Sequence, residues 1–277
     1  MSAVNLDITF GQYCEGNSIL HRLDPRAKIL AAMLYIVVIF LAKSIVSFAV
    51  LLVSAVLLIA VSRIPVRVIL RGLKPLIFVI AFTVLINIFW MDGEILLVDF
   101  AFIRIYLEGV LNALMIALRI IVLLVGTSVF MTYTTTPIAL TDGLEQLLSP
   151  LSKLKLPVHE FSMMMTIALR FIPTLVEETQ KIMNAQKARG ADFSSGSLVQ
   201  RAKALVPILV PLFISAFRRA DELATAMECR CYTGGEGRTR MNILHAGVKD
   251  YAACALVVLL GAVIVFLNAF GGYTLSW

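Results

Sequence analysis

The sequence predicts an all-α integral membrane protein with about five transmembrane helices and further amphipathic helices on the cytoplasmic side. Of the 277 residues, 60% are hydrophobic and only 15% are charged, whereas about a quarter of the residues are charged in an average soluble domain. Mean hydropathy is +0.91. The net charge of +6 does not indicate nucleic acid, because Lys and Arg of membrane proteins gather in cytoplasmic loops and at lipid headgroups. We therefore expect a multi-pass protein of the cell membrane, with the lipid bilayer as a partner and no nucleic acid.

The first two apolar stretches are too long to form one helix. Residues 29–42 are an uninterrupted apolar run, and residues 45–61 continue it after a polar Lys-Ser pair. A single helix over both would measure roughly 50 Å, against a hydrocarbon core of about 30 Å. We therefore expect two spans that fold back at this pair. Asp24 as a cap and Pro25 at the first helical position predict where the first helix begins.

Three more apolar stretches complete the predicted spans, at residues 75–90, 110–131 and 251–270. Positive charge gathers before the first span and between the second and third spans. By contrast, the connection at 91–108 carries four carboxylates and one arginine. The positive-inside rule then places the N-terminus in the cytoplasm and the C-terminus outside the cell.

This order of spans divides the chain into three regions. Residues 1–131 form an N-terminal membrane domain with four spans, residues 132–248 a cytoplasmic helical region, and residues 249–277 the C-terminal span. Apolar stretches at 161–173 and 205–217 are too short or too broken by proline to be convincing spans. We expect them in helices that lie at the membrane boundary.

Two amphipathic helices are predicted in the cytoplasmic region. From Phe213 to about Arg230, apolar residues recur at the three-and-four spacing of one helical stripe, with charged residues on the other side. Residues 158–188 follow a similar plan. Proline occurs at position 173 of one segment and at 207 and 211 in the apolar stretch that leads into the other. Each segment has a carboxylate pair midway and ends on an arginine. The repetition points to one role carried out twice.

The two endings hold the first set of candidate site residues. These are Ala188, Arg189, Gly190, Cys229, Arg230 and Cys231. Gly190 can end a helix because it tolerates positive φ, and the glycine pair at 234–235 predicts the stop after Arg230. One hypothesis is that each arginine only interacts with its helix dipole, worth about 0.3–1 kcal/mol. The other is that two exposed guanidinium groups make bidentate contacts with a partner.

A second candidate site is polar and lies inside the membrane. Arg119 falls near the middle of the fourth span, Asn112 lies on the same helical face, and Asn87 offers a polar group on the third span. An arginine at the centre of a span costs about 2.5–3.5 kcal/mol. We therefore expect Arg119 to face the helix bundle, with a structural role and a gating role as the rarer alternative.

Catalytic, metal and cofactor sites are not predicted. The stretch GGEGRTR lacks the lysine followed by a hydroxyl residue that a phosphate-binding loop requires. The Cys-x-Cys pair has no further Cys or His at ligand spacing, and tetrahedral metal sites usually need four ligands. We expect no catalytic residue and no bound cofactor in this chain. An intramembrane enzyme, which would need a reactive group of side chains within the spans, is the disfavoured alternative.

Five stretches resemble a known family, in the family's own order. They are FGQYCEGNSILHRLDPRAK at 10–28, TTTPIALTDGLEQLLSPL at 134–151, LPVHEFSMMMTIALRFIPTLVEE at 156–178, AQKARGADF at 185–193 and AMECRCYTGGEGRTR at 226–240. Together they resemble the T component of energy-coupling factor (ECF) transporters, often called EcfT, over nearly the whole chain.

The resemblance implies a scaffold of an ABC-type importer for vitamins or other micronutrients. It implies two cytoplasmic ATPases, which use ATP and Mg, and a membrane-embedded substrate-binding S component as partners. The region 132–248 then contains coupling helices, and their Ala-Arg-Gly-like ends dock on the ATPases. The second signature departs from this pattern at Cys229 and Cys231. The resemblance therefore does not settle whether residue 231 adopts the backbone conformation that a glycine allows. The opening of the chain resembles the form shared by several S components, and a dedicated cobalt or nickel form is the alternative.

Overall fold

The computed structural model describes residues 13–14, 16–90, 95–100, 103–150, 157–191, 193, 197–234 and 244–270. The chain splits into two compact units, Met1–Leu147 with Leu244–Trp277, and Leu148–Ile243. The elements are α1 (Pro25–Leu41), α2 (Ile45–Ser62), α3 (Val66–Leu73), η1 (Lys74–Leu76), α4 (Ile77–Trp90), β1 (Leu96–Phe100), β2 (Ile103–Tyr106), α5 (Leu107–Thr127), η2 (Ser128–Tyr133), α6 (Pro137–Leu148), α7 (Val158–Ala188), α8 (Leu198–Cys229) and α9 (Val248–Phe270). They confirm the predicted all-α class, with one short hairpin added.

Five helical segments in the described part of the chain are long and apolar enough to cross a membrane. They are Ile45–Ser62, Val66–Phe89, Leu107–Tyr133, Val199–Cys229 and Val248–Ala269. The number agrees with the predicted five, but the membership differs. α1, with 17 residues, is not in the set, and most of α8 is. The sequence-based division at residue 131 also separates α6 from the first unit, to which nearly all of it belongs.

The prolines in the stretch 205–217 do not interrupt a helix, contrary to the prediction. α8 runs for 32 residues through Pro207 and Pro211. Because Pro211 has no N–H, the carbonyl of Pro207, four residues earlier, loses its donor within the helix. The side chain of Gln186 on α7 donates to that carbonyl at 3.4 Å. A neighbouring helix thus supplies a donor to the carbonyl that Pro211 leaves without one.

The predicted start and end of the first helix are confirmed. Pro25 is the first residue of α1, and the side chain of Asp24 accepts a hydrogen bond from the backbone N–H of Arg26 at 2.9 Å. α1 ends at Leu41 and α2 begins at Ile45. The polar pair between the two apolar runs therefore does separate two helices.

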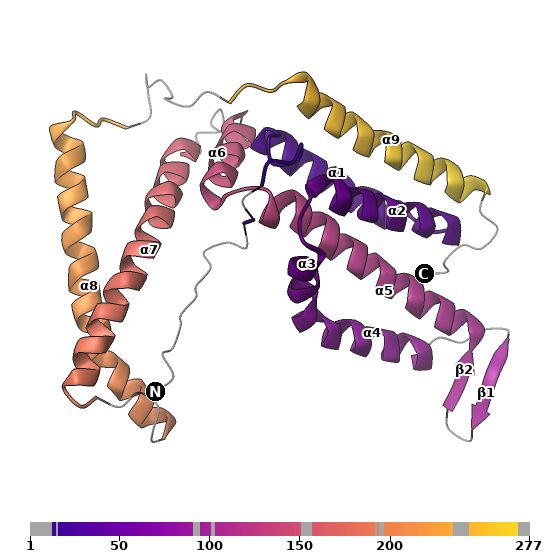
Figure 1. Cartoon of the computed structure of the whole chain (residues 1–277), viewed down its shortest axis with the longest axis horizontal. Coiled ribbons are helices and arrows are strands. Elements are labelled where there is room, and N and C mark those ends of the chain that lie inside the picture. Colours follow the sequence, from indigo (N-terminus) through magenta and orange to yellow (C-terminus); the bar gives the residue numbers. More distant parts are fainter. Residues whose placement is uncertain are drawn as a thin grey trace. The chain divides into compact units, whose positions relative to one another are not determined.

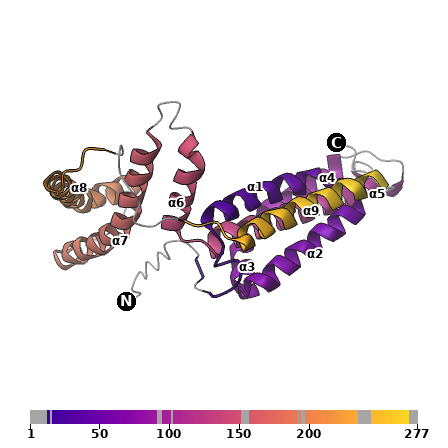
Figure 2. The same cartoon turned by 90° about the horizontal axis from the view of Figure 1, so that it is seen from above.

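In the first unit α9 packs along α1 and also touches α2, while α5 contacts both α1 and α2. Figure 2 shows α9 running between α1 and α2. Glycines allow two close approaches. A Cβ at Gly126 of α5 would collide with the ring of Tyr35, and one at Gly261 of α9 would lie 2.9 Å from Val38. Small residues at these interfaces let the backbones come close enough to bury the core.

The connection at 91–108 contains a hairpin that charge counting did not predict. β1 pairs with β2 in antiparallel register, and Asp99 stands opposite Arg104. At its base, the N–H of Leu107 donates to the carbonyl of Ile95 at 3.0 Å. The acidic connection is therefore ordered where it meets α5.

The second unit contains two long helices that run in opposite directions and cross (Figure 1). α7 has 31 residues and α8 has 32. The predicted range 158–188 coincides with α7. Large apolar side chains of α8, including Phe213 and Phe217, are exposed in this chain, which leaves apolar surface for the bilayer or a partner to cover.

Candidate functional site

α7 ends in a hydrogen-bonded motif built around Arg189. Arg189 is the C-cap residue, and Gly190 follows it with φ of +88°. The N–H of Gly190 donates to the carbonyl of Lys187, and the N–H of Ala191 to the carbonyl of Gln186, both at 3.0 Å. This pattern is the Schellman motif, in which a left-handed residue turns the chain back so that the last carbonyls find donors. Gly190 takes the role expected of it.

α8 ends in the same motif without a glycine. Arg230 is the C-cap, and Cys231 follows with φ of +54°. The N–H of Cys231 donates to the carbonyl of Glu228 at 2.9 Å, and the N–H of Tyr232 to that of Met227 at 3.0 Å. The predicted stop at 234–235 is therefore wrong, because Cys231 itself adopts the left-handed conformation. A residue with a Cβ pays about 1–2 kcal/mol for that conformation, yet the backbone geometry is retained.

Both arginines are accessible to a partner. All six residues of the two signatures are exposed. Within the described residues, neither the Arg189 nor the Arg230 guanidinium has a hydrogen-bond or ion-pair partner. Each also lies at the negative end of a helix dipole. The two arginines occupy the same position of the same motif, so the sequence similarity of the endings is also a structural one.

The arginines are far apart along the crossed pair. Gln186 contacts Pro207 and Glu178 contacts Ser215, so the two helices run in opposite directions. Arg189 therefore lies near the level of residue 204, far from the C-terminal end of α8. From that level to Arg230 is about 39 Å at about 1.5 Å per residue. One compact binding surface could not easily contact both.

A carboxylate links α7 to α8 between these ends. The Ser215 hydroxyl donates to Oε1 of Glu178 at 2.5 Å, and the Arg219 guanidinium donates to Oε2 at 2.8 Å. The Ser215 hydrogen bond, followed by the charges of Arg219 and Lys181, lowers the pKa of Glu178 below its ordinary value of 4.5. We call Glu178, Ser215 and Arg219 the Glu178 latch. The sequence showed its carboxylate as one of a pair, but not its partners.

Arg119 of the second candidate site lies in the first unit and is only 7% exposed. Its guanidinium donates to the carbonyl of Ala42 at 2.8 Å and lies 5.3 Å from the ring centre of Phe48. Ala42 is the C-cap of α1. Arg119 therefore hydrogen-bonds to a carbonyl at a helix end, where the carbonyls have no N–H donor within the helix. Asn112 is also buried, whereas Asn87 donates to the carbonyl of Thr83 within α4.

Asn268 completes the turn between α1 and α2, and sequence reasoning missed it. Its Oδ1 accepts from the N–H groups of Lys43 and Ser44 at 3.1 and 3.3 Å and from the Ser47 hydroxyl at 2.8 Å. Its Nδ2 donates to the carbonyl of Leu41 at 2.7 Å. One amide thus serves the end of one helix and the start of the next. The sequence did contain a signal for this residue, because it is a single asparagine near the end of an apolar span.

Asp250 plays the corresponding part at the other end of α9. It is 7% exposed, and its two oxygens accept from the N–H groups of Asp24 and Gly247, both at 2.7 Å. Nearby, Arg26 donates to the carbonyl of Leu244 at 3.2 Å. The two ends of α9 are therefore attached to the two ends of α1 by hydrogen bonds to the main chain.

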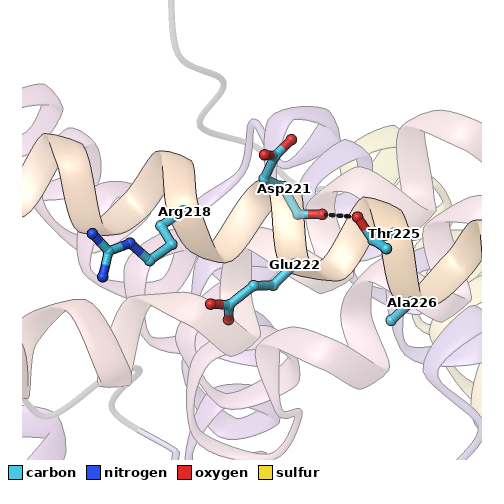
Figure 3. Close-up of a pocket in the computed structure, with 5 residues that line it drawn as sticks. All are labelled: Arg218, Asp221, Glu222, Thr225 and Ala226. Atoms are coloured by element: carbon cyan, nitrogen blue, oxygen red, sulfur yellow. Dashed lines mark hydrogen bonds between the residues drawn. The ribbon is translucent and has the colours of Figure 1, made fainter.

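An open hollow of about 410 Å³ lies along α8 (Figure 3). It is lined by Arg218, Asp221, Glu222, Thr225 and Ala226. The Thr225 hydroxyl donates to the carbonyl of Asp221 at 2.9 Å, so the hydroxyl of the hollow is engaged with its own helix. We assign no chemistry to this surface. Arg218, one of the lining residues, is the neighbour in sequence of Arg219 of the Glu178 latch.

Comparison with known proteins identifies the family. Residues 16–241 match the CbiQ family model, described as cobalt transport protein. A relative from Ruminiclostridium cellulolyticum is 50% identical over 262 residues, which cover 95% of each chain. One from Clostridium kluyveri is 53% identical over 255 residues, 91% of this chain and 94% of the relative. One from Bacillus subtilis is 47% identical over 259 residues, 94% and 97%. All three are named energy-coupling factor transporter transmembrane protein EcfT. The chain belongs to the CbiQ/EcfT family.

Membership of this family confirms the resemblance seen in the sequence. The chain is the transmembrane component of an ECF transporter. Both arginine endings and Arg119 lie within the residues matched by the family model, whereas α9 lies beyond residue 241. The relatives, which cover nearly the whole chain, extend the similarity into α9. The description of the family as cobalt transport proteins names the group and selects no cargo for this member.

Proposed function

We propose that this EcfT-family chain is the non-catalytic scaffold that couples ATP hydrolysis by two cytoplasmic ABC-type ATPases to movement of a substrate-binding S component. One observation carries the proposal: Arg189 and Arg230 are exposed C-caps of the same motif, separated by about 39 Å along the helix pair. One arginine for each ATPase accounts for the repetition and for the separation. The names of the relatives, which call them transporter transmembrane proteins, support this reading.

The size of the effect separates docking from helix capping. An arginine that only interacts with its helix dipole contributes about 0.3–1 kcal/mol. An arginine that makes charge-assisted hydrogen bonds in a desolvated interface commonly costs about 2–5 kcal/mol when truncated. Docking therefore predicts a loss of affinity of at least roughly thirtyfold for either alanine variant.

The test measures uptake and ATP hydrolysis by purified complex in proteoliposomes. We expect Arg189→Ala and Arg230→Ala each to weaken ATPase association or to uncouple hydrolysis from uptake, and the double variant to be worse. Lys187→Ala, two residues before Arg189, and Arg218→Ala, twelve residues before Arg230 on α8, remove exposed cations outside the two endings and should behave like the wild type. A double variant that assembles and transports at the wild-type ratio of substrate to ATP would remove the docking role.

For orientation, we propose that the N-terminus is cytoplasmic and the C-terminus extracellular. The cationic segments before α1 and in α3, and the acidic connection at 91–108, support this arrangement. In a background without native cysteines, Ile95→Cys at the base of the hairpin should react with an impermeant maleimide in intact cells, and Lys187→Cys should not. Labelling of Lys187→Cys alone would reverse the orientation.

The proposed cargo is a vitamin or other micronutrient, chosen by the S component. Nothing in the structure favours a dedicated cobalt or nickel form. Affinity purification in mild detergent, followed by identification of the subunits that copurify, tests the proposed partners directly. Recovery of two ATPases and at least one S component is the expected result. Recovery of the chain with no ATPase would contradict the proposal.

A further inference from the structure

α7 and α8 are joined by polar contacts at two separate places. At one, Gln186 donates to the carbonyl of Pro207. At the other, the Glu178 latch joins the carboxylate of α7 to a hydroxyl and a guanidinium of α8. On α7 the two places are eight residues apart, about 12 Å. Two separated contacts between rods fix their crossing angle, whereas one would leave the rods free to pivot.

The two contacts differ in how readily they can be changed. The Gln186 contact uses a main-chain carbonyl whose usual donor is missing because of Pro211, so its acceptor is built into the backbone. The Glu178 latch uses side chains only. The Glu178 side chain is 22% exposed and that of Arg219 is 36% exposed, so water can reach both. The latch bonds are nevertheless shorter, at 2.5 and 2.8 Å, than the exposed Gln186 bond at 3.4 Å. Removing the latch therefore leaves only the weaker polar contact, about which the helices can pivot.

The ends of the helices amplify any change in angle. Arg230 lies about 34 Å along α8 from the pivot at Pro207. A rotation of about 10° would move it by roughly 6 Å, whereas a hydrogen bond requires its atoms to be about 2.7–3.2 Å apart. Arg189, only three residues from Gln186, would hardly move. A small loss of angular control would therefore displace one arginine relative to the other.

We propose that the Glu178 latch positions the two terminal arginines by fixing the angle between α7 and α8. Glu178 is a positioning residue, which acts through the helices and not through contact with a partner. The consequence for transport rests on the proposed docking of Arg189 and Arg230. The geometric part does not, because it concerns two helices of one chain.

The first measurement follows the geometry alone. The full chain in nanodiscs, with its native cysteines replaced, carries spin labels at Met164→Cys and Glu228→Cys, which are both exposed positions. Both positions lie more than 20 residues from the pivot and on the same side of it, so their separation changes with the angle between the helices. The wild-type sequence should give one narrow distance distribution by double electron–electron resonance. Glu178→Ala should broaden or shift it. Glu177→Ala, at the exposed neighbour of Glu178, is the matched control. An unchanged distribution in Glu178→Ala would overturn the latch.

A charge exchange separates positioning from general damage. Glu178→Arg alone and Arg219→Glu alone each place like charges together and should broaden the distribution more than Glu178→Ala. The double variant restores an opposite pair and should narrow it again. Arg218→Glu with Glu178→Arg is the control, because Arg218 lines the hollow on α8 and should give no rescue. Equal rescue by both pairs would contradict the assigned contact.

The second measurement is coupling in proteoliposomes with ATPases and an S component. Glu178→Ala should lower substrate taken up per ATP at least threefold while ATP hydrolysis continues, and the charge-exchange variant should recover most of the ratio. A broadened distribution with wild-type coupling would overturn the positioning role. If Arg189→Ala and Arg230→Ala also leave coupling unchanged, the proposed docking fails as well. The distance data would then still report on the latch.

Discussion

The two units hold their helices together with different kinds of polar contact. In the first unit, Asp250, Asn268 and Arg119 all bond to main-chain groups at the ends of α1 or the start of α2. In the second, Glu178 meets the side chains of Ser215 and Arg219, which water can reach. A main-chain partner has little freedom to move away, whereas a pair of surface side chains can separate and hydrate at small cost.

Apolar surface is exposed in both units, for example at Phe78 in the first and Phe213 in the second, whereas most of the buried core belongs to the first. The core of the first unit includes fully buried side chains such as Tyr35, Ile39 and Leu51. Along α8, apolar side chains such as Phe213 and Phe217 remain more than half exposed. The first unit is thus held by a buried core and by bonds to the main chain, whereas the polar contacts between α7 and α8 of the second unit include side chains that water can reach. Breaking each kind of contact should therefore have effects of very different size.

The largest effect is expected for Asp250→Ala. It removes two charge-assisted hydrogen bonds and leaves the N–H groups of Asp24 and Gly247 without this acceptor, which should cost about 3 kcal/mol or more. Thermal unfolding in detergent measures the loss. Asp250→Asn keeps one carbonyl oxygen and should lie between wild type and Asp250→Ala. An alanine variant as stable as the wild type would show that α9 is not held at this end.

Asn268→Ala should have the next largest effect. It removes four hydrogen bonds around the turn between α1 and α2, and bonds between helices in membranes contribute about 0.6–2 kcal/mol each at most. We expect a loss of about 2 kcal/mol in the same unfolding measurement. Asn87→Ala is the control, because Asn87 bonds within its own helix and should cost much less. Equal losses would contradict the special role of Asn268.

The two helix ends should respond to substitution with opposite signs. Gly190→Ala introduces a Cβ at positive φ and should destabilise the end of α7 by about 1 kcal/mol. No heavy atom lies within 4 Å of that Cβ, so the cost belongs to the backbone alone. Cys231→Gly should stabilise the end of α8 by a similar amount. Hydrogen exchange of the last-turn amides reports both, and a stabilised Gly190→Ala would refute the shared motif.

The smallest effect concerns pH. The pKa of Glu178 is lowered in the folded chain, so its stabilising contribution is fully present above the ordinary value of 4.5 and is lost as pH falls through the lowered value. The spin-label distribution should therefore be the same at pH 8 and pH 6. A broadening within this range would show that another group controls the angle.

The sequence by itself determined features that depend on neighbouring residues. Apolar runs marked four of the five helical segments that are long and apolar enough to span a membrane, Asp24 and Pro25 marked the start of α1, and the predicted range 158–188 matched α7. Gly190 marked a helix end because its backbone freedom is a local property. The arginine endings and the family resemblance were likewise visible as short stretches of sequence.

Tertiary structure decided the features whose partners are distant in the chain. Asn268 meets residues more than 220 positions away, and Arg119 meets a carbonyl 77 positions away. The prolines of α8 were interpreted as helix breakers, and the donor that Gln186 supplies to the carbonyl left unpaired by Pro211 was not visible in the sequence. Cys231 took a conformation that its residue type disfavours, since the hydrogen bonds of the helix end compensate for the strain. Each outcome depends on which polar groups packing brings within about 3 Å, and spacing along the sequence does not specify that distance.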